Sequence, residues 1–260
     1  MVVQKYQVEK ATIDKIKKLF AHRKLSNLLK ASGLASNKEF VSDIINVQYQ
    51  IYMLDGYLES QWELDKKKIA LLWEAIEASL EAMGFSRKQI SSMTKEIKDY
   101  ERIERNMRKD KWPTKESFKD FYTTKSCDVR LVRHLIYNAF PDLGATWKEK
   151  AWRFYDIITE INDDIADVEE DILTLNGNRF LISVLRKGLD KTYNQYKEYL
   201  TVVSQKANAY FEEKADQGKN KQLIAWTMDS SLQTLKLLDQ QVKNKNADKF
   251  SASLLLARMK

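Results

Sequence analysis

The scarcity of chain-breaking residues is the feature that most limits how this chain can fold. Only 7 Gly and 2 Pro occur in 260 residues. Sheets and loop-rich folds need Gly, Pro and other turn residues wherever the chain reverses. Most of the few that do occur, among them Gly33, Gly84, Pro113 and Gly177, stand where apolar residues at helical spacing stop. The sequence therefore predicts an almost entirely helical protein.

The apolar period divides the chain into segments of helical length. It predicts helices over 8–31, 37–83 (broken once), 88–110, 114–140, 146–174, 178–215 and 219–245, and a short one at the C-terminus. Asn37, Thr114 and Thr146 can each accept a hydrogen bond from a first-turn amide, so they are the predicted N-caps. With no repeat, flexible linker or shift in composition, we expect a single helical domain over residues 1–260.

Composition bounds the class of protein. The chain is 43% hydrophobic and 31% charged, which is typical of a globular protein with a sizeable core. Its single cysteine, Cys127, excludes an internal disulfide framework and a Cys-rich zinc site, and fits a reducing cytoplasm. The N-terminal segment has no signal-peptide core, and no apolar run approaches the roughly 20 residues that span a bilayer. We therefore predict a cytoplasmic protein without a transmembrane segment.

The chain is basic, with 44 Lys and Arg against 37 Asp and Glu. Nucleic acid, a membrane surface and a phosphorylated small molecule are all anionic partners that suit such a balance. The densest basic patches, 66–68 and 102–112, resemble solvated helix faces, and no nucleic-acid-binding motif accompanies them. Nucleic acid is therefore not among the predicted partners.

Two carboxylates lie on the apolar side of the helix predicted after residue 37. Asp55 and Glu59 stand one turn apart, on the face that also carries Ile44, Ile51 and Leu58. Burying an unpaired carboxylate costs several kcal/mol, so partners are expected: a metal ion, a basic residue or a water-filled cavity. A buried salt bridge, or a place at the rim of the apolar stripe, is an equally good interpretation.

A lysine lies within the apolar stripe of the helix predicted over 114–140. The stripe runs from Phe118 to Phe140, Lys125 falls inside it, and Arg133 borders it. A cation on an apolar face suits an anionic ligand such as a diphosphate. The alternative is a lysine whose stem lies along apolar surface while its amine reaches water, which is common.

The stretch "EINDDIADVEED", residues 160–171, is the most acidic in the chain. Asp163, Asp167 and Asp171 step by four residues and would form a column along one helix, able to supply the oxygen ligands that Mg²⁺ prefers. The apolar seam, from Phe154 to Val168, lies roughly opposite. Taken alone, the pattern therefore favours an amphipathic helix with an acidic outer face, by about two to one.

Taken in order, "LDGYLE", "FYTTKS" and "ITEINDDIADVEED" resemble the class I isoprenoid synthases, a superfamily of prenyltransferases and terpene synthases. Asp55 and Glu59 match the ends of a first DDxxD motif whose second aspartate is replaced by Gly56. Lys125 and Ser126 match the Lys-Thr pair of the prenyltransferases, and "DDIAD" at 163–167 matches the second motif in full. The resemblance covers roughly residues 37–190. The chain is also similar in length to the compact moenomycin-type prenyltransferases.

The resemblance implies an antiparallel helical bundle around a central cavity and a role in isoprenoid biosynthesis. Mg²⁺ ions would bind an allylic prenyl diphosphate of the geranyl, farnesyl or geranylgeranyl class, and ionisation would leave a carbocation to be transferred to an acceptor. The implied metal ligands are Asp55, Glu59, Asp163, Asp167 and Asp171, and the first four with Lys125 form the implied catalytic set. The implied substrate-binding residues are Arg130, Arg133, Arg179, Tyr52, Trp62, Phe118 and Tyr122.

Two departures from the family bear on the second substrate. The N-terminal Gly-Gly-Lys-Arg-x-Arg segment of chain-elongating enzymes is missing, and "AHRKLSNLL" at 21–29 is at best a remnant of it. The C-terminal Arg-Tyr pair of many terpene cyclases is also absent. A prenyltransferase is the first hypothesis, a terpene cyclase the second, and a non-catalytic helical binding or adaptor protein the third. A homodimer is left open.

Overall fold

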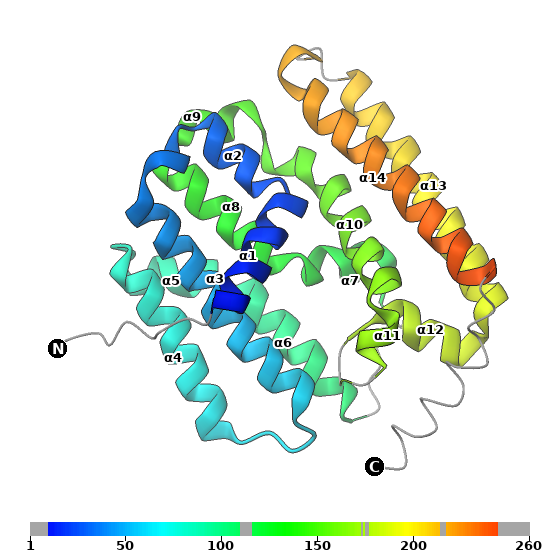
Figure 1. The fold of residues 1–260 in the computed structure, drawn as a ribbon, viewed down its shortest axis with the longest axis horizontal. Helices are drawn as coiled ribbons and strands as arrows, with labels where there is room; N and C mark the ends of the chain where they lie inside the picture. Colours follow the sequence, from blue (N-terminus) through cyan, green and yellow to red (C-terminus); the bar gives the residue numbers. More distant parts are fainter. Residues whose placement is uncertain (1–9, 110–115, 173, 175–176, 214–216, 244–260) are drawn as a thin grey trace. The chain divides into compact units, whose positions relative to one another are not determined.

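The computed structural model describes residues 10–109, 116–172, 174, 177–213 and 217–243. The helical prediction is confirmed, because every regular element in these ranges is a helix (Figure 1). The elements are α1 (Lys10–His22), α2 (Leu25–Ala31), the 3₁₀ turn η1 (Leu34–Ser36), α3 (Lys38–Ser60), α4 (Lys66–Ala82), α5 (Arg87–Met93), α6 (Lys95–Met107), α7 (Phe118–Lys125), α8 (Cys127–Ala139), α9 (Pro141–Thr146), α10 (Glu149–Ala166), α11 (Val168–Asp171), α12 (Arg179–Lys187), α13 (Leu189–Glu213) and α14 (Gln217–Lys243).

Several predicted helices are divided into two. The break expected once within 37–83 is confirmed between α3 and α4, whereas the breaks between α1 and α2, at Thr94, at Ser126 and at Gly188 were not predicted. Lys24, before α2, has a φ of 60°, a left-handed conformation that costs an L-residue about 1–2 kcal/mol. Because neither Gly nor Pro marks most of these breaks, the apolar period runs through them.

The predicted N-caps have mixed outcomes. Asn37 caps α3, because its Oδ1 accepts a hydrogen bond of 3.1 Å from the amide of Phe40. The prediction that Thr146 is an N-cap was wrong, because Thr146 is the last residue of α9, a helix that begins at Pro141. Thr114 lies outside the described residues, and α7 is capped by Ser117, whose Oγ accepts from the Asp120 amide at 3.0 Å.

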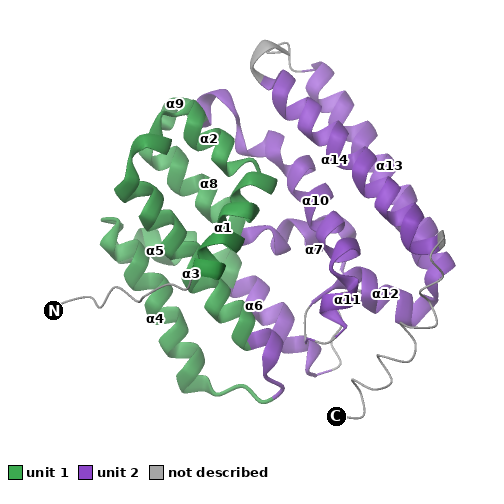
Figure 2. Ribbon diagram, in the orientation of Figure 1, with its two compact units in different colours: residues 1–57, 63–97, 128–143 green, residues 58–62, 98–127, 144–260 purple. Residues whose placement is uncertain are grey.

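The chain forms two compact units, each built from segments that are distant in sequence (Figure 2). Unit 1 comprises residues 1–57, 63–97 and 128–143, and unit 2 comprises residues 58–62, 98–127 and 144–260. The boundaries between the units fall within α3, between α3 and α4, within α6, at the start of α8 and within α9. No single cut in the sequence separates the units, which explains why no linker is visible in the composition.

Unit 1 has an aliphatic core that also contains buried, hydrogen-bonded polar side chains. Ile16, Leu28 and Ile44 are fully buried. The fully buried Gln48 donates from Nε2 to Oδ2 of Asp128 at 2.9 Å. Burial raises the pKa of the Asp128 carboxyl, while the positive charge of Arg23 and the hydrogen bond from Gln48 act in the opposite direction.

In unit 2, α10 packs against α7, α12, α13 and α14. It is buried around most of its circumference, so it resembles a central helix rather than an amphipathic surface helix. Near its start, Trp152 lies edge-on to Trp147, with ring centroids 6.0 Å apart, and Trp147 lies edge-on to Trp226 of α14 at 5.9 Å. The buried residues of α10 include three acidic side chains, Asp156, Glu160 and Asp164.

The C-terminal end of α3 is held by Arg108, which directly follows α6 and lies in the same unit as that end of α3. The guanidinium of Arg108 donates to the carbonyl oxygens of Leu58 and Gln61, the latter at 2.8 Å. Carbonyls in the last turn of a helix lack partners within the helix, and basic side chains commonly satisfy them. Arg108 thereby joins the segment that carries Glu59 to α6.

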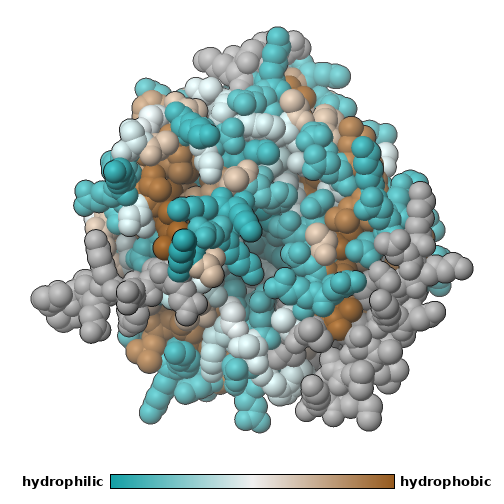
Figure 3. Space-filling model, in the orientation of Figure 1, coloured by the Kyte–Doolittle hydropathy of each residue, from teal (hydrophilic) through white to brown (hydrophobic). Residues whose placement is uncertain are grey.

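Hydrophilic residues cover much of the face shown in Figure 3, with apolar areas between them. Five large apolar side chains are exposed among the described residues: Met53, Trp62, Leu71, Leu185 and Leu232. None of the described helices combines the length and the apolar character needed to cross a membrane.

Candidate functional site

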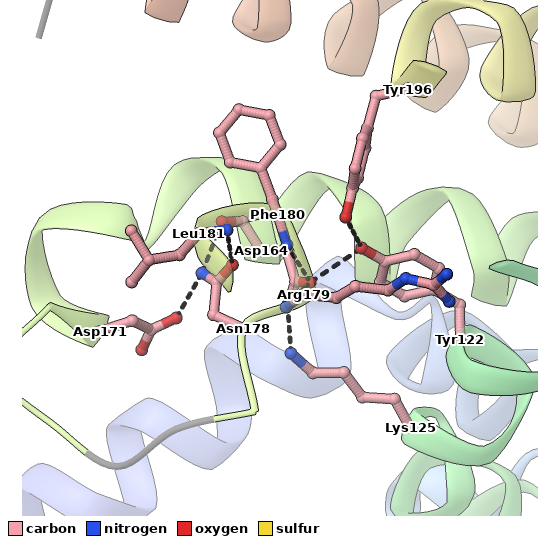
Figure 4. A network of polar contacts seen from close by, with 9 residues as sticks. All are labelled: Tyr122, Lys125, Asp164, Asp171, Asn178, Arg179, Phe180, Leu181 and Tyr196. Carbon is pink, nitrogen blue, oxygen red and sulfur yellow. Dashed lines mark hydrogen bonds and ion pairs between the residues drawn. The ribbon is translucent and has the colours of Figure 1, made fainter. Parts of the chain in front are cut away.

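A completely buried carboxylate, Asp164 of α10, is the centre of a polar network in unit 2 (Figure 4). Its Oδ2 accepts hydrogen bonds from the Tyr122 hydroxyl at 2.8 Å and from the backbone amide of Arg179 at 2.8 Å. Its Oδ1 forms an ion pair with Nζ of Lys125. The Tyr122 hydroxyl in turn lies 2.7 Å from that of Tyr196. These donors satisfy both oxygens of Asp164.

Asn178 joins this network to the next acidic residue. Its Nδ2 donates to the carbonyl oxygen of Asp164 at 2.7 Å and to Oδ2 of Asp171 at 2.8 Å. Its Oδ1 accepts from the Leu181 amide at 2.8 Å and so caps α12. One buried asparagine therefore positions the end of α10, the end of α11 and the start of α12 (Figure 4).

Lys125 lies among carboxylates. Its side chain is 14% exposed. Burial alone would lower the pKa of its amine, but the negative charges of Asp164 and Glu160 outweigh burial and raise the pKa above the usual value. Lys125 therefore stays charged, and of the two interpretations of this lysine the structure contradicts the one in which its amine reaches into water.

The acidic face of α10 is turned inward, and it is not the column that was predicted. Asp156, Glu160 and Asp164, spaced by four residues, are 2%, 4% and 0% exposed. In the predicted column, Asp163 is half-buried, Asp167 is exposed, and only Asp171 is buried. The acidic outer face favoured from the pattern alone is therefore wrong for α10, because this helix is packed on nearly all sides.

The predicted acidic residues at the end of α10 repel one another. Burial and the charges of Asp163 and Asp171 raise the pKa of Asp167 to about 6. Burial also raises the pKa of Asp171, although the hydrogen bond from Asn178 and the charge of Lys125 lower it in part. Asp167 ends α10 and precedes α11, so the acidic column turns at this point instead of continuing straight.

Glu104 of α6 contributes another buried carboxyl to unit 2. It is 2% exposed, and its Oε2 has no hydrogen-bond partner. A Cβ added at Gly177 would lie 3.7 Å from Glu104 Oε1, so the chain before α12 passes close over this carboxyl. Burial, with the nearby charge of Glu59, raises the pKa of Glu104 to about 8. At neutral pH it is therefore mainly protonated.

Glu104 should make the stability of the protein depend on pH. Between its ordinary pKa of 4.5 and its folded pKa of about 8, the folded state holds a proton that the unfolded state has released. The free energy of unfolding should therefore fall by a few kcal/mol as the pH rises from 5 to 8.5, since each pKa unit corresponds to about 1.4 kcal/mol. Urea denaturation across this range measures the slope.

Glu104→Gln should remove this contribution, because the amide has nearly the same shape and does not ionise. Glu101→Gln is the matched control on the same helix, where the native carboxylate accepts from Arg105 at 2.9 Å. We expect the control to keep the wild-type slope. An unchanged slope in Glu104→Gln would show that Glu104 does not hold the proton.

The remaining predicted acidic residues lie on α3. Asp55 and Glu59 are both half-buried, so they lie neither on a fully buried side of α3 nor on a fully exposed one. Asp55 belongs to unit 1, whereas Glu59 belongs to unit 2, where its charge acts on Glu104. The charges of Glu59 and Lys125 both act on Glu104: Glu59 raises the pKa of its carboxyl, and Lys125 lowers it in part.

The three predicted arginines have different surroundings. Arg130 belongs to unit 1 and pairs with Glu96, and Arg133, also in unit 1, is fully buried. Arg179 belongs to unit 2, but its guanidinium donates to the carbonyl of Ser117 at 2.9 Å and lies over the ring of Phe118, 4.4 Å from its centroid. Only its backbone amide joins the Asp164 network.

The predicted aromatic residues have different environments. Phe118 and Tyr122 are buried in unit 2, where Phe118 stacks on Tyr199 with centroids 4.6 Å apart. Burial, with the charge of Asp164, raises the pKa of Tyr122 well above its ordinary value, so its hydroxyl remains a donor. Tyr52 is half-buried, while Trp62 is 63% exposed and therefore lies at the surface.

Asp164, Asn178 and Glu104 were missed by the sequence reasoning. Asp164 was assigned only as the second residue of the acidic motif, although the spacing of Asp156, Glu160 and Asp164 marks a column of its own. Asn178 precedes an apolar helix start, which is a recognisable N-cap signal. Nothing in the local sequence distinguishes Glu104 from the other charged residues of α6.

No family model, no curated protein and no solved structure matches this chain. Within the described ranges, no three His, Cys, Asp or Glu side chains lie close enough together to hold a metal ion.

Proposed function

We propose that the chain is a Mg²⁺-dependent prenyltransferase of the class I type, which ionises an allylic prenyl diphosphate and transfers the prenyl group to an acceptor. The observation that carries this proposal is the charge arrangement around Lys125. This cationic lysine pairs with Asp164, and the charges of Asp164, Glu160 and Asp171, all within residues 160–171, raise the pKa of its amine. Its own charge acts in turn on Glu104 of α6, in the same unit. The order of motifs along the chain supports the same interpretation.

The residues fit a hard divalent cation by their chemistry. Asp164 is not a candidate ligand, because Lys125, Tyr122 and the Arg179 amide already occupy its oxygens. Asp163 and Asp167 lie one turn apart, and burial together with the charge of Asp163 raises the pKa of Asp167 to about 6. Mg²⁺ commonly binds one or two carboxylates and completes its shell with water and substrate phosphate. Asp163 and Asp167 would hold it, with Asp171 beside them.

The chain's own residues would perform three tasks. Asp164 and Tyr122 hold Lys125 in place, so that its amine can donate to a diphosphate oxygen without first being ordered. Asn178 fixes Asp171 beside the acidic pair. Phe118 and Tyr122 supply apolar aromatic surface, which excludes water from a carbocation. Magnesium, when bound, offsets the negative charge that develops on the departing diphosphate.

Incubation with geranyl, farnesyl and geranylgeranyl diphosphates, with and without Mg²⁺, tests the proposal. Isopentenyl diphosphate, indole and simple phenols serve as trial acceptors. A prenyltransferase gives a prenylated acceptor that forms only in the presence of Mg²⁺. A hydrocarbon formed from one diphosphate alone would instead identify a terpene cyclase, and a protein that binds diphosphate without consuming it would favour the non-catalytic hypothesis.

A further inference from the structure

Unit 1 contains a surface hollow that the proposed reaction does not use. It has a volume of about 360 Å³ and lies where α3 begins and where α4 and α8 end, in the unit coloured green in Figure 2. Its lining includes Glu39, Phe40, Asp43, Met83, Phe85 and Leu135. This volume is at the lower end of the range for small-molecule sites, about 300–1,000 Å³.

The hollow is acidic on a basic protein. Its lining includes two carboxylates, Glu39 and Asp43, and no Lys, Arg or His, although the whole chain carries a net charge of +7. The last residues of α8 and the residue after α4 also line it. Helix C-termini carry partial negative charge and favour cations. The start of α3 acts in the opposite sense, but Glu39 in its first turn offsets that effect.

The remaining surface of the hollow is apolar and partly aromatic. Phe40 and Phe85 contribute two rings, and Met83 and Leu135 contribute aliphatic surface. The face of an aromatic ring attracts a cation, and proteins that recognise ammonium ligands commonly surround them with such rings. Apolar surface next to such a group suits a hydrocarbon chain attached to the cation.

We propose that this hollow binds a small molecule in which an ammonium group is attached to a short apolar chain. Glu39 and Asp43 bind the ammonium, and Phe40 and Phe85 cover it with their rings. Met83 and Leu135 contact the hydrocarbon. The site belongs to unit 1, so it is independent of the proposed diphosphate chemistry in unit 2.

A matched series of six-carbon probes tests the proposal: hexylamine, hexanol and hexanoate, titrated into the full chain by calorimetry in an amine-free buffer at pH 7. Hexylamine should bind at least about tenfold more tightly than hexanol, and hexanoate should bind more weakly than either. Equal affinity for hexylamine and hexanol in the wild type, or no binding of hexylamine, would overturn the proposal.

Variants separate the two parts of the site. Glu39→Gln combined with Asp43→Asn should reduce the preference for hexylamine over hexanol to less than about twofold, and Glu39→Gln alone should reduce it in part. Phe85→Ala should weaken hexanol binding, and hexylamine binding at least as much, because both contact the ring. Glu63→Gln combined with Glu74→Gln removes the same charge at exposed positions of unit 1 and should leave the preference unchanged. A preference that survives in the first double variant would contradict the assignment.

Discussion

Asp164→Ala is expected to lower the free energy of unfolding by about 3–5 kcal/mol, because it leaves the buried cation of Lys125 without its partner. The change also removes the acceptor for the Tyr122 hydroxyl and the Arg179 amide. Stabilities of natural domains are typically about 5–15 kcal/mol, so a loss of this size is a large fraction of the total. Urea denaturation at pH 7, followed by circular dichroism, measures it.

The adjacent aspartate is the natural control. Asp163 is half-buried and its charge opposes ionisation of Asp167, so Asp163→Ala should change the stability by less than about 1 kcal/mol. Adding Lys125→Met to Asp164→Ala should restore part of the lost stability, because the unpaired cation is then absent. If the double variant is no more stable than Asp164→Ala, the loss does not come from Lys125.

Asp163→Asn combined with Asp167→Asn is expected to reduce Mg²⁺-dependent turnover of an allylic diphosphate by at least about 100-fold, because these two carboxylates are the proposed ligands. The stability should be retained, since the amides keep the shape of the side chains and remove the repulsion that raises the pKa of Asp167. Product formation at saturating Mg²⁺, compared with the unfolding midpoint, distinguishes loss of chemistry from loss of fold.

A charge-matched variant accompanies this experiment. Glu198→Gln combined with Glu212→Gln removes two negative charges from exposed positions of α13 in unit 2. It should turn over at a rate within about twofold of the wild type, since surface charges away from the site act only through the screened general field. Equal losses in both double variants would mean that net charge, rather than the Asp163–Asp167 pair, determines the activity.

The helical class could be predicted because it depends on what the chain lacks. With 7 Gly and 2 Pro, few positions can reverse the chain, and Gly33 and Gly84 both lie just beyond real helix ends. The additional breaks could not be predicted, because Thr94 and Ser126 are compatible with helix and only packing divides the helices there. Lys24 adopts its left-handed conformation without a glycine to signal it.

The candidate site was predicted at the level of segments but not of individual side chains. Lys125 and the motif at 160–171 do meet, and Lys125 is joined to Asp164. The choice between Asp163 and Asp164 could not be made from periodicity, because α10 is buried on nearly every side and its apolar seam does not mark the only inward face. Arg179 was predicted to bind substrate, whereas its guanidinium donates hydrogen bonds to the carbonyls of Glu116 and Ser117, just before α7.

We propose that this chain ionises an allylic diphosphate. Positional isotope exchange measures that ionisation step directly and needs no acceptor. Farnesyl diphosphate carrying a heavy-oxygen label at the bridging position is incubated with the protein and Mg²⁺, and the label is followed by mass spectrometry. We predict that the label moves to non-bridging positions, or that labelled diphosphate is released, in the wild type with Mg²⁺. Neither should occur with chelator or in the Asp163→Asn, Asp167→Asn variant. An unchanged label for the farnesyl, geranyl and geranylgeranyl substrates alike, with no release of diphosphate, would contradict the claim.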